Sequence, residues 1–179
     1  MQAGRTAEAA EQFRTLLVAS PDVVPARLGL ASLLLLQGRW QQAKVEYEVA
    51  LRHGDTDGLA QGRLGYIVLH HEADPGGALN YYNEGVAVAG AAAERASLWV
   101  GRGVALRALG QDAAAERSYQ QALMADSQHV EAWFNLGNLL RDSGRRPEAM
   151  EAYRRVLEFE PEGSLAPLAS ARIEQLASD

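Results

Sequence analysis

Apolar and polar positions alternate along this chain with the periodicity of helices. Apolar residues return at spacings of three and four, as on the packed face of an amphipathic helix. The last segment, 164–179, shows the pattern clearly, with its polar residues Arg172, Glu174 and Gln175 on one helical face. Its apolar residues share the other face: Leu165, Leu168, Ala169, Ile173 and Leu176. We therefore expect an all-α fold.

The helical pattern recurs with a period of 34 residues. Trp99 matches Trp133 at this spacing, and Gly110 matches Gly144. Such a period is typical of a solenoid built from one repeated unit. We expect each unit to form two antiparallel helices with a glycine at the turn between them. Glycine can take the left-handed backbone conformation there because it has no Cβ atom. The turn glycines are Gly38, Gly110 and Gly144.

The best copy, VEAWFNLGNLLRDSGRRPEAMEAYRRVLEFEP at 130–161, resembles the tetratricopeptide repeat. The matching positions are Trp133, Leu136, Gly137, Leu140, Ala149, Tyr153 and Pro161. The resemblance implies a right-handed α-solenoid of antiparallel helix pairs, in a single domain over 1–179. We expect about four and a half repeats plus a C-terminal capping helix: a half repeat at 1–23, repeats at 24–57, 58–95, 96–129 and 130–163, and the capping helix at 164–179.

Two sets of residues are expected to pack the helices together. Small residues in the first helix of a pair permit close approach of the second: Ala31, Gly65, Gly103 and Gly137. Aromatic residues recur on the second helix: Phe13, Tyr47, Tyr82, Tyr119 and Tyr153. We interpret these aromatic residues as core.

The second repeat departs from the pattern. One extra residue enters at its turn, HHEADPGG, and three more enter between Val86 and Trp99. We expect this repeat to carry a longer connection and an altered stacking angle. Arg102, in the next repeat, stands where the pattern has leucine.

Composition narrows the classes of partner. The net charge of −6 disfavours binding to nucleic acid, whose phosphates require basic residues. The absence of cysteine excludes disulfides and thiolate zinc sites. The longest apolar stretch, Leu28–Leu36, is about half as long as a membrane-spanning helix requires. We expect no membrane insertion and a cytoplasmic location, with the bacterial periplasm left open.

Catalytic signatures are not found in the sequence. There is no phosphate-binding loop, nucleophile elbow or His-Glu-x-x-His pair, so we expect no enzyme activity and no cofactor. The cluster His70, His71, Glu72 and Asp74 is interpreted as a solvated turn and not as a metal site, because adjacent histidines on a helix point about 100° apart. An arginine-rich stretch is interpreted as a solvated face. Its members are Arg141, Arg145, Arg146, Arg154 and Arg155.

The resemblance also implies a binding surface, because first helices of tetratricopeptide repeats line a concave groove that holds peptides or helices of partner proteins. The groove residues expected here are Leu28, Ser32, Leu35, Gly62, Tyr66, Leu69, Val100, Val104, Arg107, Phe134, Asn138 and Arg141. Most are apolar, with arginines at the rim, which favours an apolar peptide or an amphipathic helix as ligand. Only Asn138 fits the polar set by which some family members clamp acidic C-terminal tails.

Two other roles stay open. The helix at 1–23 lacks the preceding partner helix of a full repeat, so we expect either a fragment of a longer protein or self-association through this end. The chain is alternatively a regulatory or recruiting array of a larger enzyme.

Overall fold

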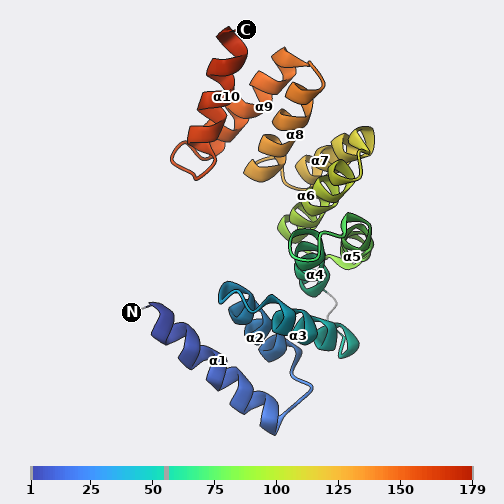
Figure 1. Cartoon of the computed structure of the whole chain (residues 1–179), viewed down its shortest axis with the longest axis vertical. Coiled ribbons are helices and arrows are strands. Elements are labelled where there is room, and N and C mark those ends of the chain that lie inside the picture. The colour runs from blue at the N-terminus through green and yellow to red at the C-terminus, as the bar shows by residue number, and fades with distance from the viewer. Residues whose placement is uncertain (1, 55–56, 179) are drawn as a thin grey trace. The chain divides into compact units, whose positions relative to one another are not determined.

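The computed structural model describes residues 2–54 and 57–178, which form ten α-helices and no strand. The predicted all-α fold is confirmed. The chain divides into two compact units, Met1–Ala89 and Gly90–Asp179. The helices are labelled in Figure 1 and have these bounds: α1 (Gln2–Ala19), α2 (Val24–Leu36), α3 (Trp40–Arg52), α4 (Leu59–His70), α5 (Pro75–Val88), α6 (Ala92–Ala108), α7 (Asp112–Ala125), α8 (Val130–Asp142), α9 (Arg146–Phe159) and α10 (Ala166–Ser178).

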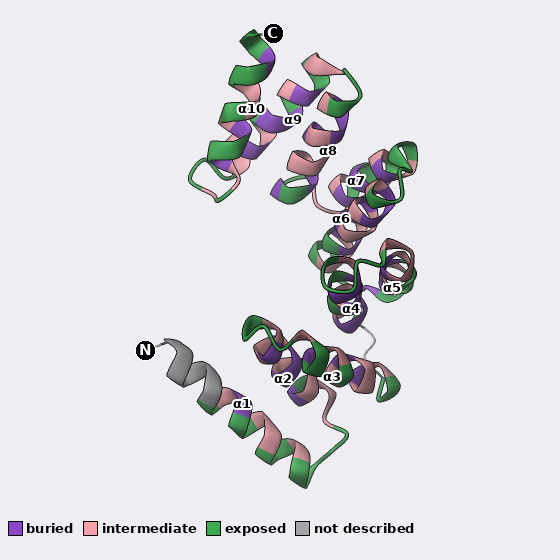
Figure 2. Cartoon of the chain, viewed as in Figure 1, coloured by how far each residue is buried: buried purple, intermediate pink, exposed green. Residues whose placement is uncertain are grey.

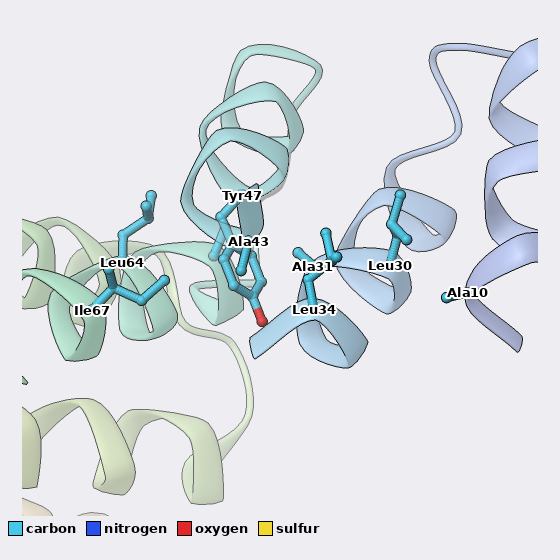
Figure 3. Close-up of a cluster of buried hydrophobic side chains, with 9 residues drawn as sticks. Ala10, Leu30, Ala31, Leu34, Ala43, Tyr47, Leu64 and Ile67 are labelled. Atoms are coloured by element: carbon cyan, nitrogen blue, oxygen red, sulfur yellow. The ribbon is translucent and has the colours of Figure 1, made fainter. Parts of the chain in front are cut away.

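The first unit contains the pairs α2–α3 and α4–α5, with α1 packed on α2 and α3 packed on α4. Its core is made by small and aliphatic side chains around one tyrosine (Figure 3). The core residues are Ala10, Leu30, Ala31, Leu34, Ala43, Tyr47, Ala60, Leu64 and Ile67. One face of each helix is thus buried, as the sequence pattern predicts, while exposed residues gather on the opposite faces and in the turns (Figure 2).

The second unit contains the pairs α6–α7 and α8–α9, with α10 packed on α9. Tyr119 and Tyr153 are fully buried. A guanidinium nitrogen of Arg146, Nη2, donates a 2.6 Å hydrogen bond to the carbonyl oxygen of Leu176 and ties α9 to the end of α10. Leu168, expected on the packed face of this last helix, is half exposed, whereas Ala169 and Leu176 are buried.

A close contact between a tyrosine ring and a glycine recurs in three helix pairs. A Cβ atom built on Gly65 would lie 2.8 Å from the ring of Tyr82, and one on Gly137 would lie 2.8 Å from the ring of Tyr153. Gly103 meets Tyr119 in the same way. The expectation that small residues permit close approach is confirmed, because no larger side chain fits under these rings.

The turn glycines also take the predicted conformation. Gly38, Gly110 and Gly144 have φ angles of 73°, 71° and 74°, in the left-handed region. In the turn from α4 to α5 the left-handed residue is instead Ala73, with φ of 54°. Next to it Asp74 caps α5, because Oδ1 of Asp74 accepts a 2.9 Å hydrogen bond from the backbone N–H of Gly77.

The prediction of a longer connection after the second repeat is wrong. Residues 89–91 alone join α5 to α6, while α6 has 17 residues against 14 in α5 and 14 in α7. The alanine-rich insertion extends the start of α6, because alanine is the strongest helix former and continues a helix more readily than a loop.

The irregular Arg102 is accommodated by its neighbours. Its Nη1 donates a 2.6 Å hydrogen bond to Oγ of Ser118, and its guanidinium lies 5.2 Å from the ring centre of Trp99. Ser118 is fully buried and occupies the place that alanine, Ala152, holds one repeat later. The hydroxyl therefore supplies the acceptor that the buried part of the arginine needs.

We predict that Gly137→Ala destabilises the protein. The clash with Tyr153 costs about 1–3 kcal/mol, of which the higher helix propensity of alanine returns at most about 1 kcal/mol. The measurement is the free energy of unfolding in urea. Gly90→Ala is the control, because a Cβ at Gly90 meets nothing within 4 Å and should leave stability nearly unchanged. Equal stability of both variants would contradict the close contact.

We predict that Ala73→Gly stabilises the protein by up to about 1 kcal/mol, because it removes the cost of a left-handed alanine. The reverse change at an equivalent turn, Gly38→Ala, should destabilise by a similar amount. Thermal unfolding followed by circular dichroism measures both shifts, and a fall in melting temperature for Ala73→Gly would overturn the explanation.

Candidate binding hollow

A surface hollow of about 590 Å³ lies in the first unit, between the first helices of its two pairs. The lining residues come from α2, α3, α4 and the position directly after α4: Ser32, Leu35, Leu36, Tyr47, Arg63, Tyr66 and His71. Three of the predicted groove residues, Ser32, Leu35 and Tyr66, are therefore brought together. Leu28 and Leu69, also predicted, are half-buried and are not among the described residues that line the hollow.

The hydroxyl of Tyr47 is a polar group in the lining of the hollow. This oxygen lies 3.0 Å from Oγ of Ser32, within hydrogen-bond distance. Burial of the ring raises the pKa of Tyr47, and the bond to Ser32 opposes that rise only in part. The tyrosine is therefore neutral at physiological pH, and the two hydroxyls offer hydrogen-bonding groups among apolar neighbours.

The walls of the hollow are apolar and aromatic. Leu36 is 80% exposed and Tyr66 is 43% exposed, so both present apolar surface to solvent within the same hollow. His71 stacks on Trp40 with ring centres 5.3 Å apart, and its ring centre lies 6.1 Å from that of Tyr66 in an edge-to-face arrangement. The stacked rings hold His71 in place, so this wall is formed before any ligand arrives.

Arg63 supplies the only charge that is fixed at neutral pH among the described lining residues. It is exposed and makes no hydrogen bond or ion pair within the described part of the chain. Burial raises the pKa of both Tyr47 and Tyr82, and the charge of Arg63 opposes the rise in each case. The positive charge of the Arg63 guanidinium thus interacts electrostatically with the hydroxyl groups of both tyrosines.

The groove residues predicted in the second unit are engaged with their own neighbours. Nη2 of Arg107 donates a 2.6 Å hydrogen bond to Asp142, and Nη2 of Arg141 donates one of 2.8 Å to the same carboxylate. Burial alone would raise the pKa of Asp142, but these two bonds outweigh it and lower the pKa. Val100 is buried, so it offers little surface to a partner.

Two other predicted groove residues lie beside Tyr153. The hydroxyl of Tyr153 donates a 2.9 Å hydrogen bond to Oδ1 of Asn138, and the ring of half-buried Phe134 lies 5.8 Å from that of Tyr153. One repeat earlier, the place of Asn138 is taken by half-buried Val104, which has no acceptor. The buried hydroxyl of Tyr119 accordingly has no hydrogen-bond partner among the described residues.

The charged clusters noted in the sequence are used in packing and pairing. His70 lies 4.6 Å from the ring of Tyr66, and Glu72 accepts a 2.7 Å hydrogen bond from Lys44. The arginine-rich stretch is paired throughout, through Asp142, Glu116, Glu148, Glu151, Glu158 and the carbonyl of Leu176. Within the described residues, no group of three or more histidine or acidic side chains is placed to hold a metal ion.

The first helices of the first unit, with their recurrent small residues and an open hollow between them, have the arrangement of tetratricopeptide repeats. Two family models with that description match residues 1–64 and 101–164. The chain belongs to the tetratricopeptide repeat family. Repeats of this family serve as protein–protein interaction scaffolds. The irregular second repeat falls largely between the two matched segments.

Known proteins agree with this assignment. Human tetratricopeptide repeat protein 6 is 25% identical over 158 residues, which are 88% of this chain and 29% of that protein. PilF of Pseudomonas aeruginosa has a similar fold, with a TM-score of 0.82 at 18% identity over 99% of this chain and 79% of PilF. YrrB, described as a tetratricopeptide protein with an unusual peptide-binding site, gives 0.67 at 22% identity over 95% of this chain and 86% of YrrB.

Membrane insertion finds no support in the helices. No helix in the described ranges combines the length and apolar character needed to cross a membrane.

Two buried tyrosines of the second unit differ in hydrogen bonding, since Tyr153 has a partner for its hydroxyl and Tyr119 has none among the described residues. Tyr153→Phe should destabilise the protein by about 0.5–1.5 kcal/mol, because it removes the bond to Asn138. Tyr119→Phe should be neutral or stabilising, because it removes a buried hydroxyl without a partner. Urea unfolding of both variants provides the comparison, and a larger loss for Tyr119→Phe would refute it.

Proposed function

We propose that this chain is a binding module that holds a short segment of a partner protein in the hollow of its first unit. The observation that carries the proposal is the set of exposed apolar side chains, Leu36 and Tyr66, beside the hydroxyls of Ser32 and Tyr47. Exposed apolar surface next to a few fixed polar groups is the usual composition of a recognition site.

The ligand is an extended apolar segment or one face of an amphipathic helix. Both place apolar side chains at regular intervals along one side, where they can meet Leu35, Leu36 and Tyr66. The hydroxyls and the guanidinium of Arg63 then fix the position of the ligand. This role requires no catalysis, so the proposal includes neither enzyme activity nor a cofactor.

The groove residues predicted in the second unit form a separate part of the proposal, within that unit. Val104, Phe134 and Arg107 are half-buried and present part of their side chains to solvent. Self-association through α1 has one observation in its favour, since Leu16 is 44% exposed and Val18 85% exposed on that helix. Light scattering over a range of concentrations tests this second candidate.

The chain spans 29% of the length of the human relative. A recruiting role within a larger enzyme therefore remains a proposal about a whole protein, which the full reading frame would decide. The cytoplasmic location also stays a prediction.

We predict that Leu36→Glu abolishes retention of the partner in a quantitative pull-down from native extract, because it puts a charge on the apolar wall. Leu36 is 80% exposed, so the fold should persist, as circular dichroism will check. Met124→Glu is the matched control, since Met124 is 77% exposed and lies outside the hollow. Proteins retained equally by all three forms would show that the hollow is not the working surface.

A further inference from the structure

Most arginines near the groove positions of this chain are already paired with carboxylates. Arg27 binds Glu46 at 2.7 Å, Arg107 binds Asp142 at 2.6 Å, and Arg145 binds Glu116 at 2.7 Å. Arg63 differs, because it lines the hollow and has neither an ion pair nor a hydrogen bond among the described residues. Its donors are therefore available to a ligand.

No described residue that lines the hollow carries a carboxylate. The acidic groups Glu46 and Glu72 of the same unit are held by Arg27 and Lys44, at 2.7 Å in both pairs. The hollow thus carries a net positive charge on a chain whose net charge is −6. A ligand with a negative group would find a complementary charge here, with no internal competitor in contact.

The walls limit what kind of anion fits. Leu35, Leu36 and Tyr66 provide apolar surface, and the volume of about 590 Å³ has room for a few side chains. A nucleic acid or a phosphorylated surface would present several charges, which a single arginine does not match. A peptide that carries one acidic residue among apolar ones matches both the single cation and the apolar walls.

We propose that the hollow selects a partner segment in which an aspartate or glutamate lies beside an apolar residue, and that Arg63 binds its carboxylate. The inference rests on the proposed function, that the hollow is the binding surface. The guanidinium donates hydrogen bonds to the carboxylate while Leu36 and Tyr66 cover the apolar neighbour. Arg63 is then the residue that sets specificity for charge.

The second unit supports the choice of Arg63 by contrast. There Asp142 already accepts hydrogen bonds from both Arg107 and Arg141. An acidic ligand would have to displace this internal carboxylate, with no gain in the number of ion pairs. The acidic residue of the partner is therefore assigned to the first unit.

The test is selection of peptides from a displayed random-sequence library on four forms of the whole chain: wild type, Arg63→Gln, Arg52→Gln and Leu36→Glu. Arg52 is exposed on α3 and does not line the hollow, so Arg52→Gln controls for the loss of one positive charge. Circular dichroism confirms that each form is folded. We expect wild type and Arg52→Gln to enrich peptides with an acidic residue next to an apolar one, and Arg63→Gln to lose the acidic preference.

One selected peptide is then synthesised with its acidic residue and with the matching amide. Fluorescence anisotropy should show about fivefold or greater weakening by the amide on wild type, and no difference between the peptides on Arg63→Gln. If the selected peptides are apolar without acidic enrichment, or bind Arg63→Gln equally well, the role of Arg63 is overturned while the hollow remains the binding site. If no selected peptide depends on Leu36, the proposed function fails and this inference fails with it.

Discussion

The close approach of a tyrosine ring to a glycine governs the packing of the helix pairs. Tyr82, Tyr119 and Tyr153 each lie over a glycine of the preceding helix, at a distance that a Cβ atom would not allow. Since each ring fills the space that a side chain would otherwise take, the two helices come close enough to exclude water. The buried aliphatic residues around them then complete the core.

This packing also positions the hydroxyl ends of the tyrosines. A buried tyrosine places its oxygen near the residue 15 positions earlier, which is Ser32 for Tyr47 and Asn138 for Tyr153. The same side chain therefore contributes its ring to the core and its oxygen to a hydrogen bond with the preceding helix. In the first unit this oxygen lies in the hollow, beside Arg63.

Irregular positions are accommodated locally. Arg102 replaces a leucine and is matched by the hydroxyl of Ser118, and Ala73 takes a conformation that glycine takes in the other turns. The alanine-rich insertion lengthens α6 by about one turn. None of these changes requires a new architecture, because a repeat needs only to keep its contacts with its immediate neighbours.

The sequence by itself determined the helical repeat, the turn glycines, the small residues under the tyrosines and the family, because each depends on spacing along one chain. It also predicted Ser32, Leu35 and Tyr66 as residues of one surface, and these three line the hollow of the first unit. Leu36 was not predicted as a lining residue, because helical spacing selected its neighbour Leu35 for that face. Arg63 was not among the groove residues that the sequence predicted. Only the tertiary structure decided which charges are neutralised. Arg107 and Arg141 pair with Asp142, whereas Arg63 has no such partner among the described residues. These outcomes depend on distances between helices, which the spacing of residues along the sequence does not fix.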